Sequence, residues 1–346
     1  MDERYLILTE GQTHPTPAKL AAGVLRYRPE RVVALLDSTQ AGRDAGELLG
    51  VGHGVPIVAT VREALPLGPT ALVIGITPAG GRLPQEWRAI ILMAMRHGLD
   101  VISGMHTLLG DDEEFVAVAK KYGVRLVDLR KPPEDIDVNR CRAQKSATFR
   151  IHTVGTDCNC GKKVTALEIE RELRKRGKNA TFIATGQTGI LITGKGIAMD
   201  HVISDFVSGA AEKLILENAD FDYLVIEGQG SVVHPLYSGV TVSMLHGFAP
   251  QALILCHQPD RKIVRGTPDT PVPSLQLMRN LVERLAAPVF PATVVGISLN
   301  LASFSDEQAG AEIGRVESEL GLPATDVIRF GAEKLVDAIL EFEESL

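Results

Sequence analysis

The sequence predicts an α/β protein made of two doubly wound domains, each with a parallel sheet covered by helices. Short apolar runs alternate with amphipathic stretches along the chain, as expected where crossover helices join parallel strands. A charged segment without periodicity interrupts this alternation, which then restarts with a glycine-rich turn that carries lysines. We therefore expect domains at residues 1–130 and 149–346, separated by a linker at residues 131–148.

The first half of the chain predicts five strands with helices between them. The predicted strands are Tyr5–Leu8, Val32–Leu36, Ala71–Ile76, Val101–Ile102 and Val124–Val127. The predicted helices are Pro17–Tyr27, Pro84–His97 and Asp112–Tyr122. Acidic residues open the last of these helices, where they complement the positive end of its dipole. No G-x-G-x-x-G motif follows the first strand, so we expect no dinucleotide site there.

The second half repeats the alternation of strands and helices. A strand that carries Phe149, Ile151 and Val154 precedes the glycine-rich turn, and a helix follows it. Further strands are predicted at Ala180–Ala184, Tyr223–Ile226, Ala252–Cys256 and Thr293–Leu299, and an amphipathic helix at Asp205–Asn218. Beyond Asn300 the pattern predicts a helix, a short strand and a last helix.

The turn Gly155–Lys163 (GTDCNCGKK) is typical of a phosphate-binding loop. Backbone amides, a helix N-terminus and a lysine converge on an anion in this arrangement. The loop is one residue longer than G-x-x-x-x-G-K-[ST], and Lys163 replaces the hydroxyl residue that normally holds Mg²⁺. This replacement weakens the case for Mg-ATP chemistry, although Thr165 is a partial substitute. The candidate cofactor-binding residues are Gly155, Thr156, Asp157, Cys158, Asn159, Cys160, Gly161, Lys162, Lys163, Thr165 and Asn300.

Polar residues that follow the other strands are candidates for catalysis and substrate binding. An acid at a buried strand end can orient metal, water or substrate, and an Asp beside a His tunes it for proton transfer. The candidate catalytic residues are Glu227, His234, His201 and Asp200. The candidate substrate-binding residues are Gln187, Thr188, Gln229, Ser231, Arg261 and Arg265. The same patterns also fit acids that cap turns or helices and a solvated charged loop.

Composition excludes several classes of function. The 346 residues carry a net charge of −7, whereas a nucleic-acid-binding domain is usually basic. No segment approaches the roughly 20 apolar residues of a membrane span, and the first residues do not resemble a secretory signal. Four cysteines fit reduced thiols, and Cys158-x-Cys160 lacks zinc spacing. We expect a cytoplasmic homo-oligomer with small-molecule substrates, without a nucleic-acid partner, a membrane partner or a metal.

Several phrases of the sequence resemble known families. GTDCNCGKK resembles the phosphate loop of dethiobiotin synthetases, which share the longer G-T-D-x-x-x-G-K spacing. TGQTG, VISDFVSGAAE, EGQGSVVHP and LCHQP, in this order, more specifically resemble a family long labelled as of unknown function. GGRLPQEWRAI and GMHTLLGDD extend this resemblance over nearly the whole chain. That family joins an N-terminal Rossmann-like domain to a phosphate-loop domain, and its members are described as D-glutamate N-acetyltransferases that use acetyl-CoA.

The resemblance implies transfer of an acetyl group from acetyl-CoA to the amino group of D-glutamate or a related amino acid. The phosphate loop would hold the CoA phosphates through Lys162 and its amides, without an obligatory metal. Glu227 is expected as the general base, with His234 or His201 as rivals, and the two candidate arginines would hold the glutamate carboxylates. Two other functions remain open: an ATP-dependent ligase or kinase of the dethiobiotin-synthetase type that uses Mg-ATP, and a non-catalytic nucleotide or CoA sensor.

Overall fold

The computed structural model describes residues 3–76 and 81–346 of the chain. The chain divides into two compact units. The first unit consists of Met1–Pro132 together with Ile190–His201, and the second consists of Pro133–Gly189 and Val202–Leu346. Residues 133–148, which belong to the predicted linker, group with the second unit. Helix α7 (Gln187–Thr193) contains the point where the second unit gives way to the segment that groups with the first.

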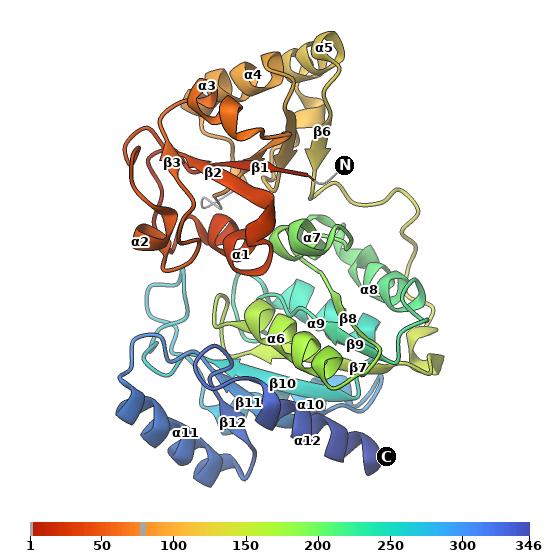
Figure 1. The fold of residues 1–346 in the computed structure, drawn as a ribbon. Coiled ribbons are helices and arrows are strands. Elements are labelled where there is room, and N and C mark those ends of the chain that lie inside the picture. The colour runs from red at the N-terminus through yellow and green to blue at the C-terminus, as the bar shows by residue number, and fades with distance from the viewer. Residues whose placement is uncertain (1–2, 77–80) are drawn as a thin grey trace. The chain divides into compact units, whose positions relative to one another are not determined.

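The described part of the first unit contains a six-stranded parallel sheet in the order β3-β2-β1-β4-β5-β6 (Figure 1). Its strands are β1 (Tyr5–Leu8), β2 (Val32–Leu36), β3 (Ile57–Val58), β4 (Ala71–Ile74), β5 (Asp100–Ser103) and β6 (Leu126–Asp128). Its helices are α1 (Lys19–Tyr27), α2 (Ala45–Leu49), α3 (Val61–Ala64), α4 (Arg88–Arg96) and α5 (Glu113–Tyr122).

Alternate residues of these strands belong to two hydrophobic cores, one on each face of the sheet. Leu6 and Leu8 of β1 belong to a core that includes residues of α3, α4 and α5. Tyr5 and Ile7 belong to a second core that includes residues of α1. Successive strand side chains point to opposite faces, so a run of four buried residues requires cover on both sides. This arrangement confirms the prediction of a doubly wound, Rossmann-like domain.

The second unit contains another six-stranded parallel sheet among the described residues, in the order β12-β11-β10-β7-β9-β8. Its strands are β7 (Phe149–Gly155), β8 (Ala180–Ile183), β9 (Tyr223–Ile226), β10 (Ala252–His257), β11 (Thr293–Leu299) and β12 (Ala324–Thr325). Its helices are α6 (Lys162–Lys175), α8 (Val207–Leu216), α9 (Ser238–Phe248), α10 (Leu275–Ala286), α11 (Asp306–Leu320) and α12 (Glu333–Glu344), besides the start of α7.

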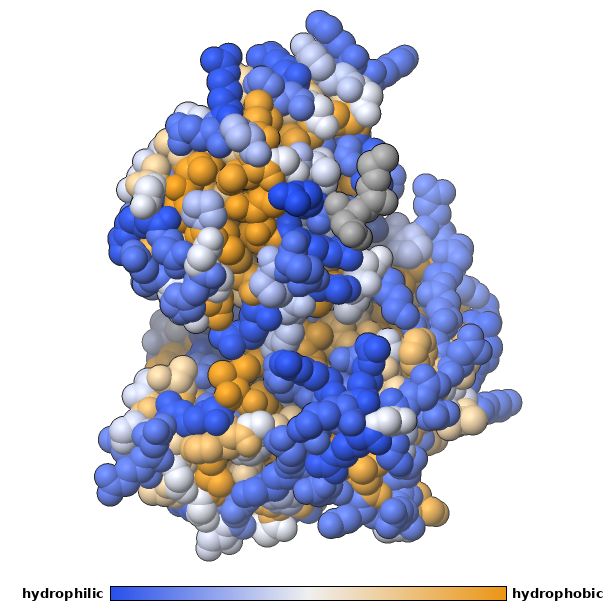
Figure 2. Space-filling model, in the orientation of Figure 1, coloured by the Kyte–Doolittle hydropathy of each residue, from blue (hydrophilic) through white to orange (hydrophobic). Residues whose placement is uncertain are grey.

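Helices cover both faces of the second sheet as well. Helices α6 and α12 pack on one face and against each other, whereas α9 and α10 lie on the other face (Figure 1). Figure 2 shows mostly hydrophilic side chains over α6 and α12, as expected for helices that bury one side and expose the other. None of the helices in residues 3–76 and 81–346 combines the length and apolar composition that crossing a bilayer requires.

The predicted strands and helices are confirmed, with small differences at their ends. For example, the predicted strand Val124–Val127 is β6 at Leu126–Asp128, and the predicted helix Pro84–His97 is a 3₁₀ turn at Gln85–Trp87 followed by α4. Three elements of the first unit were not predicted in any form, namely the two-residue strand β3, the five-residue helix α2 and the four-residue helix α3. All three are too short to show a periodic pattern.

Two histidines of the second unit are neutral, the buried His152 and the half-buried His257. Burial is the main influence on both, and it lowers the pKa of His152 in β7 to about 4 and the pKa of His257 at the end of β10 to about 4. The imidazole of an unfolded chain has a pKa near 6.5, so each group binds its proton at a much higher pH when the chain unfolds.

We expect the free energy of unfolding to fall as the pH drops from about 6.5 towards 4. In that window the unfolded chain binds protons on these histidines and the folded chain does not, which favours unfolding. The loss is about 1.4 kcal/mol per histidine for each pH unit. Urea unfolding across this range measures it. A His152→Gln chain should lose stability less steeply than the unchanged chain, and equal slopes would contradict the assignment.

Candidate functional site

The predicted phosphate loop connects two elements of the second unit. Strand β7 ends at Gly155 and helix α6 begins at Lys162. The backbone φ angle is 52° at Asn159 and 111° at Gly161, and such positive angles let successive amides turn towards one concavity. The first turn of α6 carries no acidic residue, so the positive end of the helix dipole is not offset there. This local geometry suits an anion.

Lys162 is buried within the loop. Its Nζ donates to the carbonyl of Asp157 at 2.6 Å and lies 3.6 Å from Cys160 Sγ. A Cβ atom at Gly228 would lie 2.9 Å from Cδ of this lysine and 1.8 Å from the carbonyl oxygen of Thr153. Only glycine therefore fits at position 228. The ammonium forms no ion pair with an acid of residues 3–76 or 81–346, and burying an unpaired charge is costly.

Asp157 is a buried carboxylate that joins three loops. Its Oδ2 accepts hydrogen bonds from Arg261 Nη1 at 2.7 Å and from the Arg265 amide at 2.9 Å. Its Oδ1 accepts from the Cys158 amide at 2.6 Å and lies 3.4 Å from His234 Nε2. Burial has the largest effect on this carboxyl and favours a higher pKa, but the hydrogen bonds from Arg265 and Arg261 outweigh it, so the pKa is lowered. Asp157 is therefore ionised.

Both ring nitrogens of His234 have partners. Nδ1 accepts from the Leu236 amide at 3.2 Å, so Nε2 carries the proton and donates to the Arg265 carbonyl at 3.0 Å. The ring is fully buried, and its centroid lies 4.6 Å from that of Tyr237. These contacts suit a residue that holds loops together better than one that exchanges protons with a substrate.

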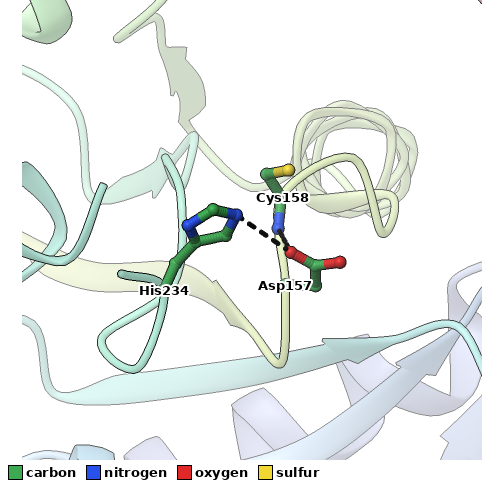
Figure 3. Close-up of side chains that lie close together, drawn as sticks. All are labelled: Asp157, Cys158 and His234. Atoms are coloured by element: carbon green, nitrogen blue, oxygen red, sulfur yellow. Dashed lines mark hydrogen bonds and ion pairs between the residues drawn. The ribbon is translucent and has the colours of Figure 1, made fainter. Parts of the chain in front are cut away.

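Figure 3 shows Asp157, Cys158 and His234 close together, with their potential metal-ligating atoms within 4.8 Å of one another. Burial and then the negative charge of Asp157 raise the pKa of the Cys158 thiol, so the thiol stays protonated at neutral pH and is a weak nucleophile and metal ligand. Arg261 already places a positive charge against the same carboxylate. Both features disfavour a divalent ion in this cluster.

Glu227 directly follows β9, and the loop after β8 encloses its carboxylate. Its Oε2 accepts hydrogen bonds from the amides of Thr185 at 3.0 Å and Gly186 at 3.2 Å. The hydroxyl of Thr185 donates to the Glu227 carbonyl at 2.9 Å. Because β9 lies between β8 and β7 in the sheet, Glu227 is next to the phosphate loop at the carboxyl edge, where α/β enzymes place their chemistry.

One predicted substrate-binding residue lies beside this carboxylate, and two others belong to the segment that encloses it. Gln229 Nε2 donates to Thr185 Oγ1 at 3.1 Å. Gln187 and Thr188 belong to the segment Thr185–Gly189, and a Cβ atom at Gly189 would lie 2.5 Å from Glu227 Oε2. The strand ends therefore bring Gln229 to Glu227 and place Gln187 and Thr188 in the adjoining segment. Ser231 is fully buried, and its Oγ accepts from a neighbouring amide in the turn before His234.

The two predicted arginines differ in their surroundings. Arg261 donates to Asp157, to the Cys158 carbonyl at 2.6 Å and to the side chain of Gln258. Arg265 contributes its backbone to Asp157 and His234, while its exposed guanidinium forms no hydrogen bond or ion pair with the residues that the structure describes. Arg261 is thus built into the loop, and Arg265 offers its charge to solvent.

The other predicted site residues are Thr165, Asn300, Asp200 and His201, and each has partners other than the Glu227 carboxylate. Thr165 forms a buried hydroxyl pair with Ser298 at 2.7 Å. The amide of Asn300 donates to the carbonyl of His257 at 2.8 Å, directly after β11. Asp200 and His201 group with the first unit.

In the first unit these two residues form a polar cluster. Asp200 pairs with the nearly buried Arg130 and lies 4.0 Å from His106 Nε2. His201 Nδ1 lies 3.4 Å from His106 Nδ1. Burial and then the charge of Arg130 lower the pKa of His106, so this ring is neutral at pH 7. The sequence analysis did not identify Arg130 or His106, because their contacts join segments far apart in the chain.

Another residue that the sequence analysis did not assign to the site is His257. Its Nδ1 lies 2.9 Å from the hydroxyl of Thr156 in the phosphate loop. Its position directly after a buried strand was the available signal, since ligands bind at the carboxyl ends of parallel strands.

Comparisons with known proteins cover almost the entire chain. The family described as "Domain of unknown function (DUF1611_C) P-loop domain" matches residues 137–336, and "Domain of unknown function (DUF1611_N) Rossmann-like domain" matches residues 38–132. A protein named D-glutamate N-acetyltransferase from Tritonibacter scottomollicae is 41% identical over 97% of this chain and 98% of its own length. One of the same name from a Pseudoalteromonas species is 38% identical over 96% of this chain and 97% of its own length.

The fold is also similar to a crystal structure. A DUF1611 family protein from Anabaena variabilis is 36% identical, with a TM-score of 0.94 over 98% of this chain and 99% of that chain. The fold of each unit therefore occurs in a solved structure.

We expect Asp157→Asn to lower the free energy of unfolding by about 3 kcal/mol, the lower end of the range for breaking a buried ion pair. The lower end applies because Arg261 keeps some contact with solvent. The pKa of Asp157 is lowered, so its contribution is present above about pH 3.9 and is lost as the pH falls through the lowered value. Urea unfolding at neutral and acidic pH measures both effects.

The matched control for this variant is Asp135→Asn, which removes a solvent-exposed ion pair with Lys213. Exposed pairs contribute little, so we expect no measurable change. Equal stability of the Asp157→Asn chain and the unchanged chain at neutral pH would show that the three loops do not depend on this carboxylate.

Proposed function

The chain belongs to the DUF1611 family and is an N-acetyltransferase, and we propose that it transfers the acetyl group of acetyl-CoA to the amino group of D-glutamate. The names of two relatives that match it over nearly their full length support this acceptor. The observation in the structure that carries the proposal is the buried ammonium of Lys162 inside an anion-binding loop.

The phosphate loop supports CoA as the acetyl carrier. Lys162 has only a neutral carbonyl and a thiol as close partners among the described residues, and a phosphate would supply the missing negative charge. The loop amides and the start of α6 would add to this interaction. CoA carries a pyrophosphate that fits such a loop, and no phosphoryl group is transferred, so the hydroxyl that holds Mg²⁺ is not needed. We propose that no metal is obligatory.

Acetyl transfer to an ammonium group begins with loss of a proton. We assign this step to Glu227, whose carboxylate lies at the strand end beside the phosphate loop. The neutral amine then attacks the thioester carbonyl, and the C–S bond breaks as the tetrahedral intermediate collapses. The CoA thiolate leaves and takes up the second proton, which the attacking nitrogen loses as the amide forms. His234 is a weaker candidate because both of its ring nitrogens have partners in the structure. His201 remains an alternative from the first unit.

The two carboxylates of glutamate require cationic partners. Arg265 is the better placed of the two predicted arginines because its guanidinium is exposed, whereas Arg261 is occupied by Asp157 and loop carbonyls. An arginine can bind a carboxylate through two parallel hydrogen bonds. Gln229 lies beside Glu227, and Gln187 and Thr188 belong to the loop and helix start that enclose its carboxylate, so all three are candidates for further polar contacts to the acceptor.

Release of the CoA thiol tests this function directly. With acetyl-CoA present, we expect D-glutamate to cause thiol release that EDTA does not diminish, and L-glutamate to be a much poorer acceptor. ADP release from Mg-ATP with a strict Mg²⁺ requirement would instead favour a ligase or kinase of the dethiobiotin-synthetase type. Tight CoA binding with no thiol release from any D- or L-amino acid would favour a sensor.

We expect Glu227→Gln to lower kcat by about 10²–10⁴-fold, the usual contribution of a general base, while the affinity for CoA stays unchanged. Steady-state kinetics and calorimetric CoA titration measure the two quantities. Glu170→Gln is a matched control, since Glu170 lies on α6 and pairs with Arg174 away from the strand ends. Turnover of the Glu227→Gln enzyme within a few-fold of the unchanged enzyme would remove Glu227 from this role.

A further inference from the structure

A cavity of about 520 Å³ lies in the second unit next to the phosphate loop. It is lined by His257 and by residues of the following loop, by Phe304 and by two residues of α11. His257 connects the cavity to the phosphate loop, because its Nδ1 lies 2.9 Å from the hydroxyl of Thr156. A volume of this size is typical of a small-molecule site, and neither the catalytic groups nor the candidate substrate-binding residues line it.

The strand order places this cavity and Glu227 on opposite sides of the phosphate loop. The cavity lies at the ends of β10 and β11, the phosphate loop follows β7, and Glu227 follows β9. These strands are neighbours in the order β11-β10-β7-β9, and all of them are parallel. A ligand with phosphates in its middle would therefore extend one end into the cavity and the other towards Glu227.

CoA has this arrangement of groups, with adenosine 3′-phosphate on one side of the pyrophosphate and the thioester arm on the other. The cavity offers an aromatic ring at Phe304, which suits a base. It also offers the carboxylates of Asp260 and Glu312, which already accept from Ser303 and Arg315 and keep lone pairs for ribose hydroxyls or an amino group. Burial holds the pKa of His257 at about 4, so its ring is neutral. These groups match a nucleoside better than an apolar ligand.

Of the two cationic side chains that line the cavity, Lys262 is the one without an ion pair among the described residues. Arg315 is occupied by two carboxylates, Glu312 at 2.7 Å and Glu319 at 2.6 Å. Lys262 is exposed, donates to the Pro259 carbonyl at 3.0 Å, and forms no ion pair within the described part of the chain. Its charge acts on His257 and Glu312, two residues that line the cavity. Lys262 is therefore available for an additional phosphate.

We propose that this cavity binds the adenosine end of CoA and that Lys262 recognises its 3′-phosphate. This inference rests on the proposed use of acetyl-CoA. Lys262 would then determine specificity for CoA. Other nucleotides share the adenosine and the pyrophosphate with CoA but lack the 3′-phosphate. The phosphate loop alone cannot make this distinction, because it contacts the part that these ligands share.

Calorimetric titration of the full chain with CoA, 3′-dephospho-CoA and ADP tests the proposal. A hydrogen bond between charged groups changes affinity by about 10- to 100-fold. We expect the unchanged chain to bind CoA tighter than 3′-dephospho-CoA by about this factor. In Lys262→Gln the affinity for CoA should fall to that for 3′-dephospho-CoA, while the affinities for 3′-dephospho-CoA and ADP stay the same. Phe304→Ala should weaken all three ligands similarly.

Lys175→Gln is the matched control, because it also removes one exposed positive charge but lies at the end of α6, where its partners are Glu172 and Glu333. It should leave all affinities unchanged, and thermal unfolding of each variant verifies that it is folded. Equal affinity of the unchanged chain for CoA and 3′-dephospho-CoA would overturn this inference alone, as would an equal loss for both ligands in Lys262→Gln. Failure of both CoA forms to bind the unchanged chain would overturn the proposed function with it.

Discussion

The site in the second unit depends on one buried carboxylate. Asp157 stands in a loop whose amides and lysine favour anions, so its own negative charge would disfavour an anion there unless that charge is neutralised. Arg261 supplies the neutralising charge at 2.7 Å, and the Arg265 amide and His234 complete the surroundings. One acid thereby fixes the phosphate loop, the loop after β9 and the loop after β10 relative to one another. Preorganised loops lose less entropy when a ligand binds.

The parallel sheet then determines which groups meet at the site. The strands β11, β10, β7 and β9 are neighbours although they are far apart in the sequence, and their carboxyl ends share one edge. A cavity of about 520 Å³, the phosphate loop and a carboxylate follow these strands in that spatial order. No single segment of the chain contains these three features. The fold brings them together because crossover connections of consistent hand return each strand to the same edge.

The longer strands, several helices and the phosphate loop could be predicted from the sequence because their signals are local, whereas the helices α9 and α10 were not identified. Buried strands such as Tyr223–Ile226 appear as apolar runs, and the loop has its own spacing of glycines and lysine. The strand β3 and the helix α2 could not be predicted, since two or five residues show no period. Arg261 was recognised as a cation, but its binding to Asp157 was not, because 104 residues separate the two partners. Residue type predicts what a side chain can bind, whereas tertiary structure decides which partner it has.

The replacement of the usual hydroxyl residue by Lys163 changes the charge of the phosphate loop. In a loop that holds Mg-ATP, the hydroxyl at this position binds the metal, and the metal neutralises the phosphates. Here lysines occupy positions 162 and 163, and the next hydroxyl residue along the chain is Thr165, whose side chain is buried against Ser298. Two protein-bound positive charges would match the two negative charges of a pyrophosphate diester, which is the form that CoA presents. A triphosphate with its metal would bring both more negative charge and a cation that the second lysine repels. The replacement at position 163 therefore favours a ligand that is held by its phosphates but not cleaved at them.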